Sequence, residues 1–350
     1  MTIDRSAIRR ILVIRFKPVG DVLLTTAYLQ ALRDAFPDAR IDFCTFKPYD
    51  QILDHHPSID NVVAFRPSTK PDFIFRWLPF LWGIRCTGYD LVIDQHNGTG
   101  SAQVAMASGA RYRLGWDYGR FGFVKNVKAA RGAERYEARA NFDMLAPLGI
   151  TEQPFSLFYH IAPESYEYVD RWFDEQGLDP RKTVCFSPGG KSPKRMWNTA
   201  SYARLAHMVE ERTDHRTVII WAPFELECAR KMHELAGGKP LLAPPTTLNQ
   251  AAAFLRRITL LVCHNCGLMH LSVATQTPNL AIFGNSRVAN WSPQGSAPNH
   301  WHLYDPSWEP NPENDFGITP ERAFEDVQRI LSELEQAEPV ADSSAGTVSR

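Results

Sequence analysis

Short apolar runs recur along the chain, and each is followed by a loop and then by apolar positions at helical spacing. The first run, residues 11–14, is aliphatic and rich in β-branched side chains, which is typical of a strand buried on both faces of a parallel sheet. Pro18 and Gly20 interrupt the pattern, and apolar positions return at helical spacing from Val22. Residues 11–36 therefore predict a strand, a tight loop and a helix.

The same unit is predicted repeatedly in two blocks, which are separated by a connecting segment at residues 149–163. Further strands are predicted at residues 40–46, 62–65, 89–96, 183–186, 217–221, 258–263 and 279–284. Helices are predicted at 102–108, around 137–145 with a stop at Pro147, at 268–275 and at 319–335. Two more helices are predicted with one end each: one begins near residue 198, and the other ends at residue 232. The alternation indicates an α/β protein, and 350 residues exceed the size of one comfortable core. We expect two domains, residues 1–163 and 164–336, and a disordered tail at 337–350.

Asp21 lies where the first loop meets its helix, at the carboxyl end of the first predicted strand. Open α/β sheets bind their ligands at this edge. One interpretation is an N-cap, because an Asp side chain accepts a hydrogen bond from a free helix N–H group. The other is a general base at the mouth of a cleft, which requires a substrate site on the opposite side. The residues of the loop alone leave both interpretations open.

Charge and composition restrict the class of partner and the compartment. The formal net charge of −1 disfavours a nucleic-acid partner, since proteins that bind phosphate backbones usually carry a basic excess. The N-terminus has no apolar core of signal-peptide length and no run approaches a membrane span, so we expect a cytoplasmic protein. The cysteines are scattered as in a reduced protein, and the C-x-x-C of Cys263 and Cys266 is a weak candidate for metal or redox chemistry.

Residues 73–85 are crowded with aromatic side chains and carry only two arginines as charges. They fit a core-packing helix that is interrupted at Pro79. They fit equally well an interfacial patch at the inner face of a membrane, with Trp77 and Trp82 at headgroup depth and the arginines on lipid phosphates. The aromatic pattern does not separate these two interpretations.

Several loops bear on nucleotide binding. The first loop reads KPVGD and the second strand ends in Lys47, whereas a dinucleotide-binding unit has G-x-G-x-x-G and an acidic residue at these places. The loop at residues 187–195, SPGGKSPKR, offers backbone N–H groups beside Lys194 and Arg195, which suits a diphosphate, with a solvated basic turn as the alternative. Glu225 follows a strand, where its carboxylate could bridge two ribose hydroxyls or cap its own helix.

Two more loops are expected at the same cleft. The helix after His264-Asn265-Cys266-Gly267 presents its N-terminus there, and a helix N-terminus attracts anions. The loop Asn97-Gly98-Thr99-Gly100 follows the strand at 89–96, so parallel strands would place it at the same sheet edge as Asp21. Its polar side chains are candidates to line the cleft.

Four segments carry a resemblance to a known family. They read ILVIRFKPVGDVLLTTAYLQAL, YDLVIDQHNGTGSAQVAMASGARYRLGW, FSPGGKSPKRMWNTASYARLA and HNCGLMHLSVATQTPNLAIFGNS. In this order they resemble the motifs of glycosyltransferase family 9, the ADP-heptose:lipopolysaccharide heptosyltransferases, and the resemblance covers about residues 10 to 335. It implies the GT-B fold, in which an N-terminal acceptor-binding and a C-terminal nucleotide-sugar-binding Rossmann-like domain face each other across a cleft.

The resemblance also implies roles for individual residues. Asp21 matches the family's proposed general base, which takes the proton of an acceptor hydroxyl as that hydroxyl attacks the anomeric carbon with inversion. Lys194 or Arg195 matches the basic residue that faces the diphosphate, and the loop's departure from K-R-W-P leaves the choice open. Glu225 matches the acidic residue that contacts the donor nucleoside. The other implied positions are Gly189, Asn265, Cys266, Gly267, Leu268, Met269 and His270 for the donor, and Lys17, Gly20, Gln95 and Asn97 for the acceptor.

The same resemblance implies a donor site without a metal, no cofactor besides the ADP-sugar substrate, and a glycolipid or glycan acceptor. One departure bears on activity, because Asn265 stands where the family has an aspartate and an amide cannot carry charge at neutral pH. We therefore expect an inverting glycosyltransferase that moves a heptose or a related sugar. Two alternatives stay open: a sugar-nucleotide-binding homologue that has lost turnover, and a sugar-nucleotide epimerase of the same fold.

Overall fold

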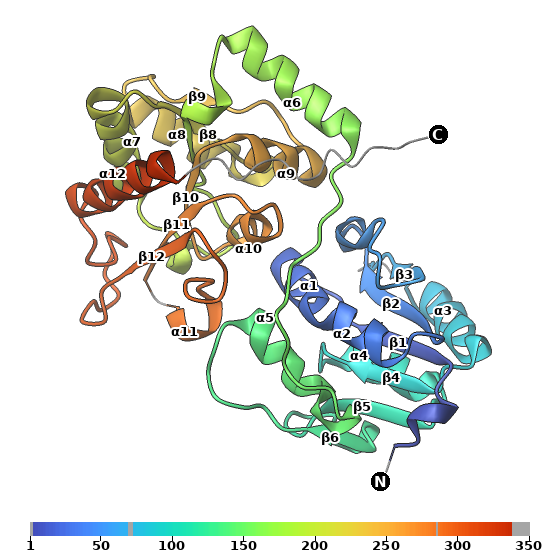
Figure 1. Ribbon diagram of the computed structural model, residues 1–350. Coiled ribbons are helices and arrows are strands. Elements are labelled where there is room, and N and C mark those ends of the chain that lie inside the picture. The colour runs from blue at the N-terminus through green and yellow to red at the C-terminus, as the bar shows by residue number, and fades with distance from the viewer. Residues whose placement is uncertain (1–2, 69–72, 285, 338–350) are drawn as a thin grey trace.

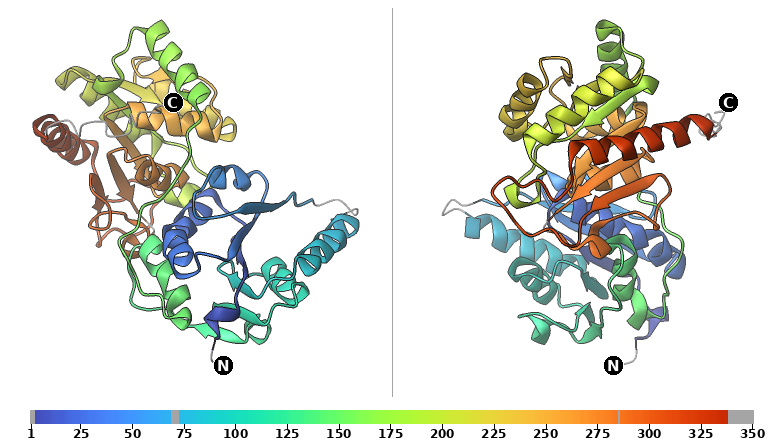
Figure 2. Two further views of the ribbon diagram at one scale, coloured as in Figure 1. Left: turned by 45° about the vertical axis from the view of Figure 1, so that its right-hand side comes forward. Right: turned by 90° about the vertical axis from the view of Figure 1, so that its left-hand side faces the viewer.

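The protein folds into two α/β lobes, each built on a parallel sheet of six strands, and one extended segment joins them (Figure 1). The computed structural model describes residues 3–68, 73–284 and 286–337. Helices cover the faces of both sheets, and the lobes lie against each other with the carboxyl ends of their strands toward the contact (Figure 2). The predicted α/β class with two Rossmann-like units is confirmed.

The N-terminal lobe has the strand order β3-β2-β1-β4-β5-β6. Its strands are β1 (Arg10–Ile14), β2 (Arg40–Phe46), β3 (Asn61–Phe65), β4 (Leu91–Asp94), β5 (Tyr112–Trp116) and β6 (Val127–Ala129). Its helices are α1 (Val19–Thr25), α2 (Leu29–Ala35), α3 (Phe73–Thr87), α4 (Thr99–Ala107) and α5 (Glu137–Ala140). Because β1 lies in the middle of the sheet and is covered on both faces, its aliphatic side chains at residues 11–14 are fully buried.

The C-terminal lobe has the strand order β12-β11-β10-β7-β8-β9. Its strands are β7 (Thr183–Phe186), β8 (Arg216–Ile219), β9 (Leu241–Leu242), β10 (Leu260–His264), β11 (Asn279–Phe283) and β12 (His300–Tyr304). Its helices are α6 (Pro163–Gln176), α7 (Thr199–Arg212), α8 (Leu226–Leu235), α9 (Leu248–Arg257), α10 (Gly267–Ala274), α11 (Val288–Trp291) and α12 (Pro320–Gln336). The α12 N-terminus is capped by the Thr319 side chain, with Pro320 as first residue, as predicted.

Helices α6, α9 and α11 and strands β9 and β12 of the C-terminal lobe were not predicted. Helix α6 packs against α9 and buries Ser165, Val169 and Phe173 at four-residue spacing, so a helical pattern is present in this largely polar segment. Strand β12 lies at the sheet edge, where it mixes exposed and buried positions within a polar sequence. The predicted domain limits at 1–163 and 164–336 stay predictions, and the tail from residue 338 lies outside the described residues.

Two predictions about helix ends in the N-terminal lobe are wrong. Helix α1 begins at Val19 with Pro18 as N-cap, so Asp21 is the third helical residue and not the cap. The helix expected around 137–145 is a single turn, α5, that continues as a 3₁₀ helix over Asn141–Leu148 with Pro147 inside it.

Helix α3 has one apolar face in the core and another in contact with solvent. Trp77 is buried, stacks on Phe73 and Phe80, and donates from Nε1 to Gln103 at 2.8 Å, so its predicted place at headgroup depth is wrong. Trp82 in contrast is 69% exposed. The core-packing interpretation of residues 73–85 therefore holds for one side of the helix, and the expected interruption at Pro79 is wrong, because α3 runs through it. Membrane contact of the exposed side stays a prediction.

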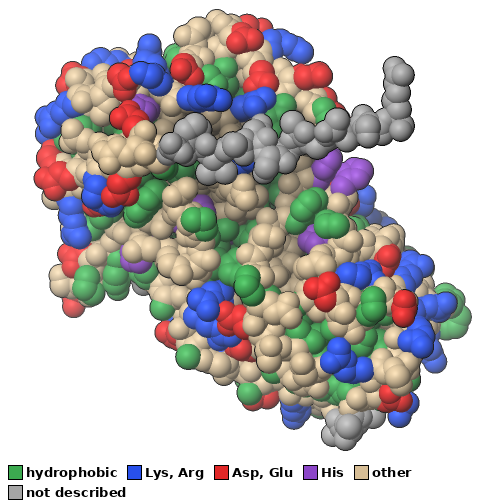
Figure 3. Space-filling model, viewed as in Figure 1, with side chains coloured by type: hydrophobic (Ala, Val, Ile, Leu, Met, Phe, Trp, Pro, Cys, Tyr) green, Lys and Arg blue, Asp and Glu red, His purple; other side chains and the backbone are tan. Residues whose placement is uncertain are grey.

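The lobes contact each other through α1 and α10, which pack side by side (Figure 1). Buried side chains of both helices belong to one continuous hydrophobic cluster, including Val22 and Leu23 on α1 and Met269 and Leu271 on α10. Charged side chains of both signs are interspersed over the outer face of both lobes (Figure 3). Among the described residues, no helix combines the length and the apolar character that crossing a membrane requires.

Candidate active site

A cavity of about 450 Å³ lies between the lobes. The first turn of α1 forms its N-terminal side, and the loops that follow β7, β8 and β10 form its C-terminal side. These are the carboxyl ends of parallel strands, where open α/β sheets bind ligands, and the volume is typical of small-molecule sites. The predicted residues that line it are Gly20, Asp21, Gly189, Arg195, Glu225, Asn265, Cys266, Gly267, Leu268 and His270.

Five predicted residues do not line the cavity: Lys17, Gln95, Asn97, Lys194 and Met269. Gln95 is 1% exposed and donates from its side chain to Asn141 at 2.6 Å, inside the N-terminal lobe. The Asn97 side chain accepts a hydrogen bond from buried Lys125. Met269 is fully buried in the hydrophobic cluster, because the helical period turns it away from the ligand side of α10.

Asp21 is held by a neighbouring cation rather than used as a helix cap. Its carboxylate accepts a hydrogen bond from the Arg15 guanidinium, and both side chains are 15% exposed. Arg15 also donates to the backbone carbonyl of Gln95 at 2.7 Å, which ties the pair to the end of β4. The carboxylate is therefore fixed at the sheet edge and lines the cavity.

The basic loop after β7 faces the cavity with Arg195 and Lys191 rather than with Lys194. Lys191 lies with its ammonium 5.8 Å from the ring centroid of Phe224, which also lines the cavity and is 60% exposed. Within the described residues, no hydrogen bond or ion pair engages the Arg195 guanidinium. This leaves the Arg195 guanidinium available for an anionic ligand. Because Arg195 lines the cavity and Lys194 does not, the structure favours Arg195 as the residue that faces the diphosphate.

Glu225 has the capping role that its position suggested, and a role in ribose binding stays a prediction. One carboxylate oxygen accepts from the backbone N–H of Ala222 at 2.8 Å, so the side chain closes its own helical turn. Burial raises the pKa of this carboxyl group, and the carboxyl lines the cavity. Gly189 is required opposite it, because a Cβ at that position would lie 2.6 Å from the Cβ of Glu225.

The turn between β10 and α10 supplies backbone N–H groups to the lining of the cavity. Cys266 is the N-cap, Gly267 is the first helical residue, and the α10 N-terminus therefore faces the ligand space. His264 is buried with its Nδ1 at 3.3 Å from the Tyr202 hydroxyl, and burial lowers its pKa to about 4. Asn265 is 8% exposed, and its side-chain nitrogen has no hydrogen-bond partner in the described part of the chain.

A carboxylate from one lobe thus shares a cavity with cations and a helix N-terminus from the other. The family model of the heptosyltransferases, glycosyltransferase family 9, matches residues 80–310. The chain belongs to glycosyltransferase family 9. This membership confirms that the protein is a glycosyltransferase of the heptosyltransferase type, as the four segments suggested.

The relatives of this family 9 glycosyltransferase are distant in sequence and close in fold. It is 23% identical to lipopolysaccharide heptosyltransferase 3 of Escherichia coli K12 over 289 residues, which cover 78% of this chain and 82% of that protein. A family 9 glycosyltransferase from Veillonella parvula superposes with a TM-score of 0.81 at 22% identity, covering 93% and 97% of the two chains. The E. coli ADP-heptose heptosyltransferase II superposes with a TM-score of 0.75 at 20% identity, covering 93% and 99%.

Further residues of this family 9 glycosyltransferase line or support the cavity and were not predicted as site residues, among them Arg15, Tyr136, Lys191 and Trp291. Lys191 had a local signal, because it lies inside the basic loop. Arg15 follows β1 and lies only six residues before Asp21, so an ion pair between these two side chains could have been predicted from their spacing. Tyr136 and Trp291 have no such signal, since they reach the site only through tertiary packing.

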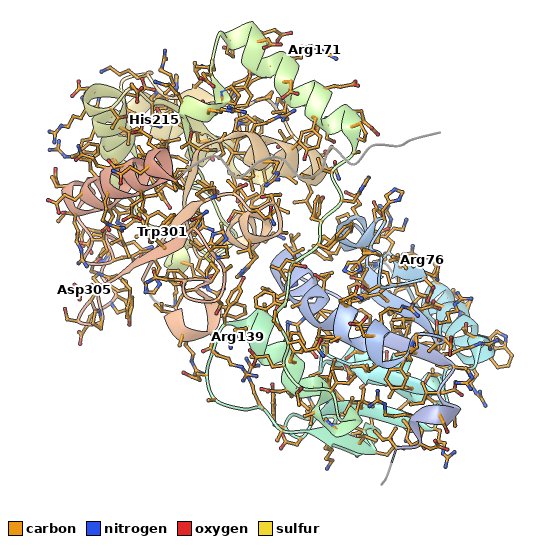
Figure 4. The ribbon with its side chains drawn as sticks, in the orientation of Figure 1. Arg76, Arg139, Arg171, His215, Trp301 and Asp305 are labelled. Atoms are coloured by element: carbon orange, nitrogen blue, oxygen red, sulfur yellow. The ribbon has the colours of Figure 1, made fainter. Side chains whose placement is uncertain are left out.

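One group of candidate metal ligands occurs among the described residues, and it is remote from the cavity. Asp214, His215 and Glu335 lie close together at the outer end of the C-terminal lobe, where Figure 4 labels His215. Asp214 already accepts a hydrogen bond from Lys182, so a cation occupies its side chain. The group lines no part of the site.

Proposed function

We propose that the protein transfers a heptose, or a related sugar, from an ADP-activated donor to a lipopolysaccharide core or another surface glycan, with inversion at the anomeric carbon. The observation that carries the proposal is the single cavity in which Asp21 from α1 faces Arg195, Lys191 and the α10 N-terminus. Membership of the heptosyltransferase family supports the sugar, and the name of the E. coli ADP-heptose heptosyltransferase supports the ADP donor.

Each half of the cavity has one chemical task in this proposal. The carboxylate of Asp21 takes the proton of an acceptor hydroxyl while that oxygen forms its bond to the anomeric carbon. The bond between the anomeric carbon and the diphosphate oxygen breaks in the same step, and the electron pair leaves with ADP. Arg195, Lys191 and the amides of α10 stabilise the charge that builds on the departing diphosphate. A single displacement of this kind inverts the configuration.

The donor nucleoside fits the outer part of the cavity. Phe224, exposed on one wall and approached by Lys191, offers a face on which a base can stack. The carboxylate oxygen of Glu225 that does not cap Ala222 is the candidate acceptor for ribose hydroxyls. The positive groups then take the diphosphate, and no metal has a role in this proposal.

Asn265 decides between turnover and binding alone. It lines the cavity from the position of the family aspartate and has the size of that residue, but it offers one acceptor oxygen and an NH₂ donor in place of two charged acceptor oxygens. A role in orienting the sugar is compatible with an amide, and a role that needs charge is not. The second candidate function, a sugar-nucleotide-binding homologue without turnover, rests on this residue.

The test is ADP release from ADP-heptose with and without a heptose-accepting lipopolysaccharide core. We expect release that depends on acceptor, that falls at least about 10²-fold in Asp21→Asn, and that is unchanged in the exposed control Asp38→Asn. Acceptor-dependent release at the wild-type rate in Asp21→Asn would remove Asp21 from the mechanism. Donor binding without transfer, even in Asn265→Asp, would favour the binding homologue, and product formation without acceptor would favour an epimerase.

We also propose that α3 places the enzyme on a membrane surface that carries its glycolipid acceptor. Its exposed side holds Ile74, Phe75, Leu78 and Trp82, which are 47 to 76% exposed, and Arg76 lies on the same helix at the far side of the N-terminal lobe (Figure 4). The predicted cytoplasmic location stays a prediction.

Vesicle binding tests this contact. Sedimentation with vesicles of anionic and zwitterionic phospholipid is expected to weaken severalfold in Phe75→Ser combined with Trp82→Ser. The control Leu235→Ser removes an apolar side chain that is 53% exposed on α8, in the other lobe, and is expected to sediment like the wild type. Equal sedimentation of all three proteins would refute the contact.

A further inference from the structure

His270 is held by a hydrogen bond that crosses the contact between the lobes. It lies on α10 of the C-terminal lobe, while Tyr136 directly precedes α5 of the N-terminal lobe. The Tyr136 hydroxyl lies 3.1 Å from His270 Nδ1, and the ring centroids are 5.9 Å apart at an interplanar angle of 30°. Tyr136 is 2% exposed and His270 is 4% exposed, so water does not compete for this bond.

The protonation states of the two side chains define which atom donates. Burial lowers the pKa of His270 to about 3, so its imidazole is neutral and carries one proton. Burial raises the pKa of Tyr136, so its phenol keeps the hydroxyl proton. His270 Nδ1 is the only hydrogen-bond partner of that hydroxyl in the described part of the chain. The phenol therefore donates to Nδ1, because the reverse would leave a buried hydroxyl proton without an acceptor.

This direction assigns the imidazole proton to Nε2. His270 lines the cavity that contains Asp21, and Nε2 has no protein partner among the described residues. The ring cannot turn easily. A Cβ on Gly20 would lie 2.8 Å from His270 Cδ2, and the Trp291 ring centroid is 6.1 Å away on another side. The Nε2–H group is thus left as a fixed, neutral donor for a ligand.

We propose that Tyr136 is a positioning residue, which holds His270 as the Nε2–H tautomer so that it donates to an oxygen of the nucleotide-sugar diphosphate. The proposal rests on the proposed function for the identity of that ligand. Both groups that fix the ring, Tyr136 and the Gly20 turn, come from the N-terminal lobe, whereas the donor loops belong to the other lobe. His270 is therefore oriented for donation only when the lobes are in contact.

The variant Tyr136→Phe removes the hydroxyl and keeps the ring. Without it, both tautomers of His270 become accessible and Nδ1 is left unpaired, so stabilisation of the departing diphosphate weakens. We expect kcat for acceptor-dependent ADP release to fall about tenfold and the donor KM to stay within about twofold. The matched control is Tyr28→Phe, since Tyr28 is also fully buried in the N-terminal lobe and its hydroxyl has no partner among the described residues.

A nuclear magnetic resonance measurement tests the same assignment without turnover. In protein labelled with ¹⁵N-histidine, the two ring nitrogens of His270 report directly which one carries the proton. We expect Nε2–H in the wild type and in Tyr28→Phe, and a mixture of tautomers in Tyr136→Phe. Because this measurement needs no sugar donor, it stands even if the protein proves to use another substrate.

Combination with a change at His270 separates positioning from a general loss of stability. His270→Gln keeps an N–H donor near the place of Nε2, and in that background Tyr136→Phe is expected to change kcat less than about twofold. An Nδ1–H tautomer in the wild type, or a wild-type kcat in Tyr136→Phe, would overturn the proposal. If Tyr136→Phe does not fold, the tautomer measured in the wild-type protein decides: Nε2–H supports the proposal and Nδ1–H overturns it.

Discussion

Replacing Gly20 by alanine tests the contact between the lobes most directly. Gly20 is the second residue of α1, and the added Cβ would lie 2.8 Å from Cδ2 of the His270 ring. The ring has little room to retreat, because Tyr136 holds its Nδ1 at 3.1 Å. The substitution therefore moves α1 away from α10, and the displaced contact also weakens or breaks the hydrogen bond between Tyr136 and His270.

The expected cost follows from three contributions. Alanine favours the helix over glycine by about 1 kcal/mol. Overpacking a tight contact costs about 1–3 kcal/mol, and losing the hydrogen bond to His270 costs about 1 kcal/mol more. The free energy of unfolding is therefore expected to fall by about 1–3 kcal/mol. The rate of transfer is expected to fall more than tenfold, because the shift separates Asp21 from the donor loops.

Urea unfolding and acceptor-dependent ADP release, measured side by side, give both quantities. Gly83→Ala is the matched control, because Gly83 lies inside α3 and an added Cβ would meet nothing within 4 Å. That variant is expected to be stabilised by up to about 1 kcal/mol at unchanged activity. A Gly20→Ala protein that is as stable and as active as the wild type would refute the argument that Gly20 and Tyr136 together leave the His270 ring no room to move.

The remaining predictions concern stability. Burial lowers the pKa of His56, His264 and His300 to about 4, so the unfolded chain binds more protons below pH 6.5, and stability that is complete above pH 6.5 is lost as the pH falls toward 4. A urea midpoint that stays constant from pH 7.5 to 5 would contradict this. Tyr89→Phe deprives the fully buried Asp42 carboxylate of a 2.7 Å hydrogen bond and is expected to cost about 2 kcal/mol in urea unfolding, whereas a cost near zero would show that Arg40 alone satisfies Asp42. Thr319→Ala removes the cap of α12 and is expected to cost about 1 kcal/mol, with Thr319→Ser close to wild type in the same assay.

Much of this protein is determined by local sequence. The β-branched run at residues 11–14 and its counterparts specify most strands of both sheets, because burial on both faces requires continuous apolar side chains. The loops at the carboxyl ends of parallel strands must converge at one sheet edge. The strand pattern therefore places Asp21 at the sheet edge of one lobe, and Glu225 and the α10 N-terminus at the sheet edge of the other. That the two edges share one cleft was implied by the family resemblance and not by the strand pattern.

Tertiary structure decided the features that depend on the direction of a side chain or on distant partners. Only the folded loop distinguishes Arg195 from Lys194, and only packing turns Gln95 inward to Asn141, because polar side chains at loops and strand ends have no periodicity to read. The bond between Tyr136 and His270 joins residues 134 positions apart. No local pattern encodes such a pair, since it exists only where two separately folded lobes meet.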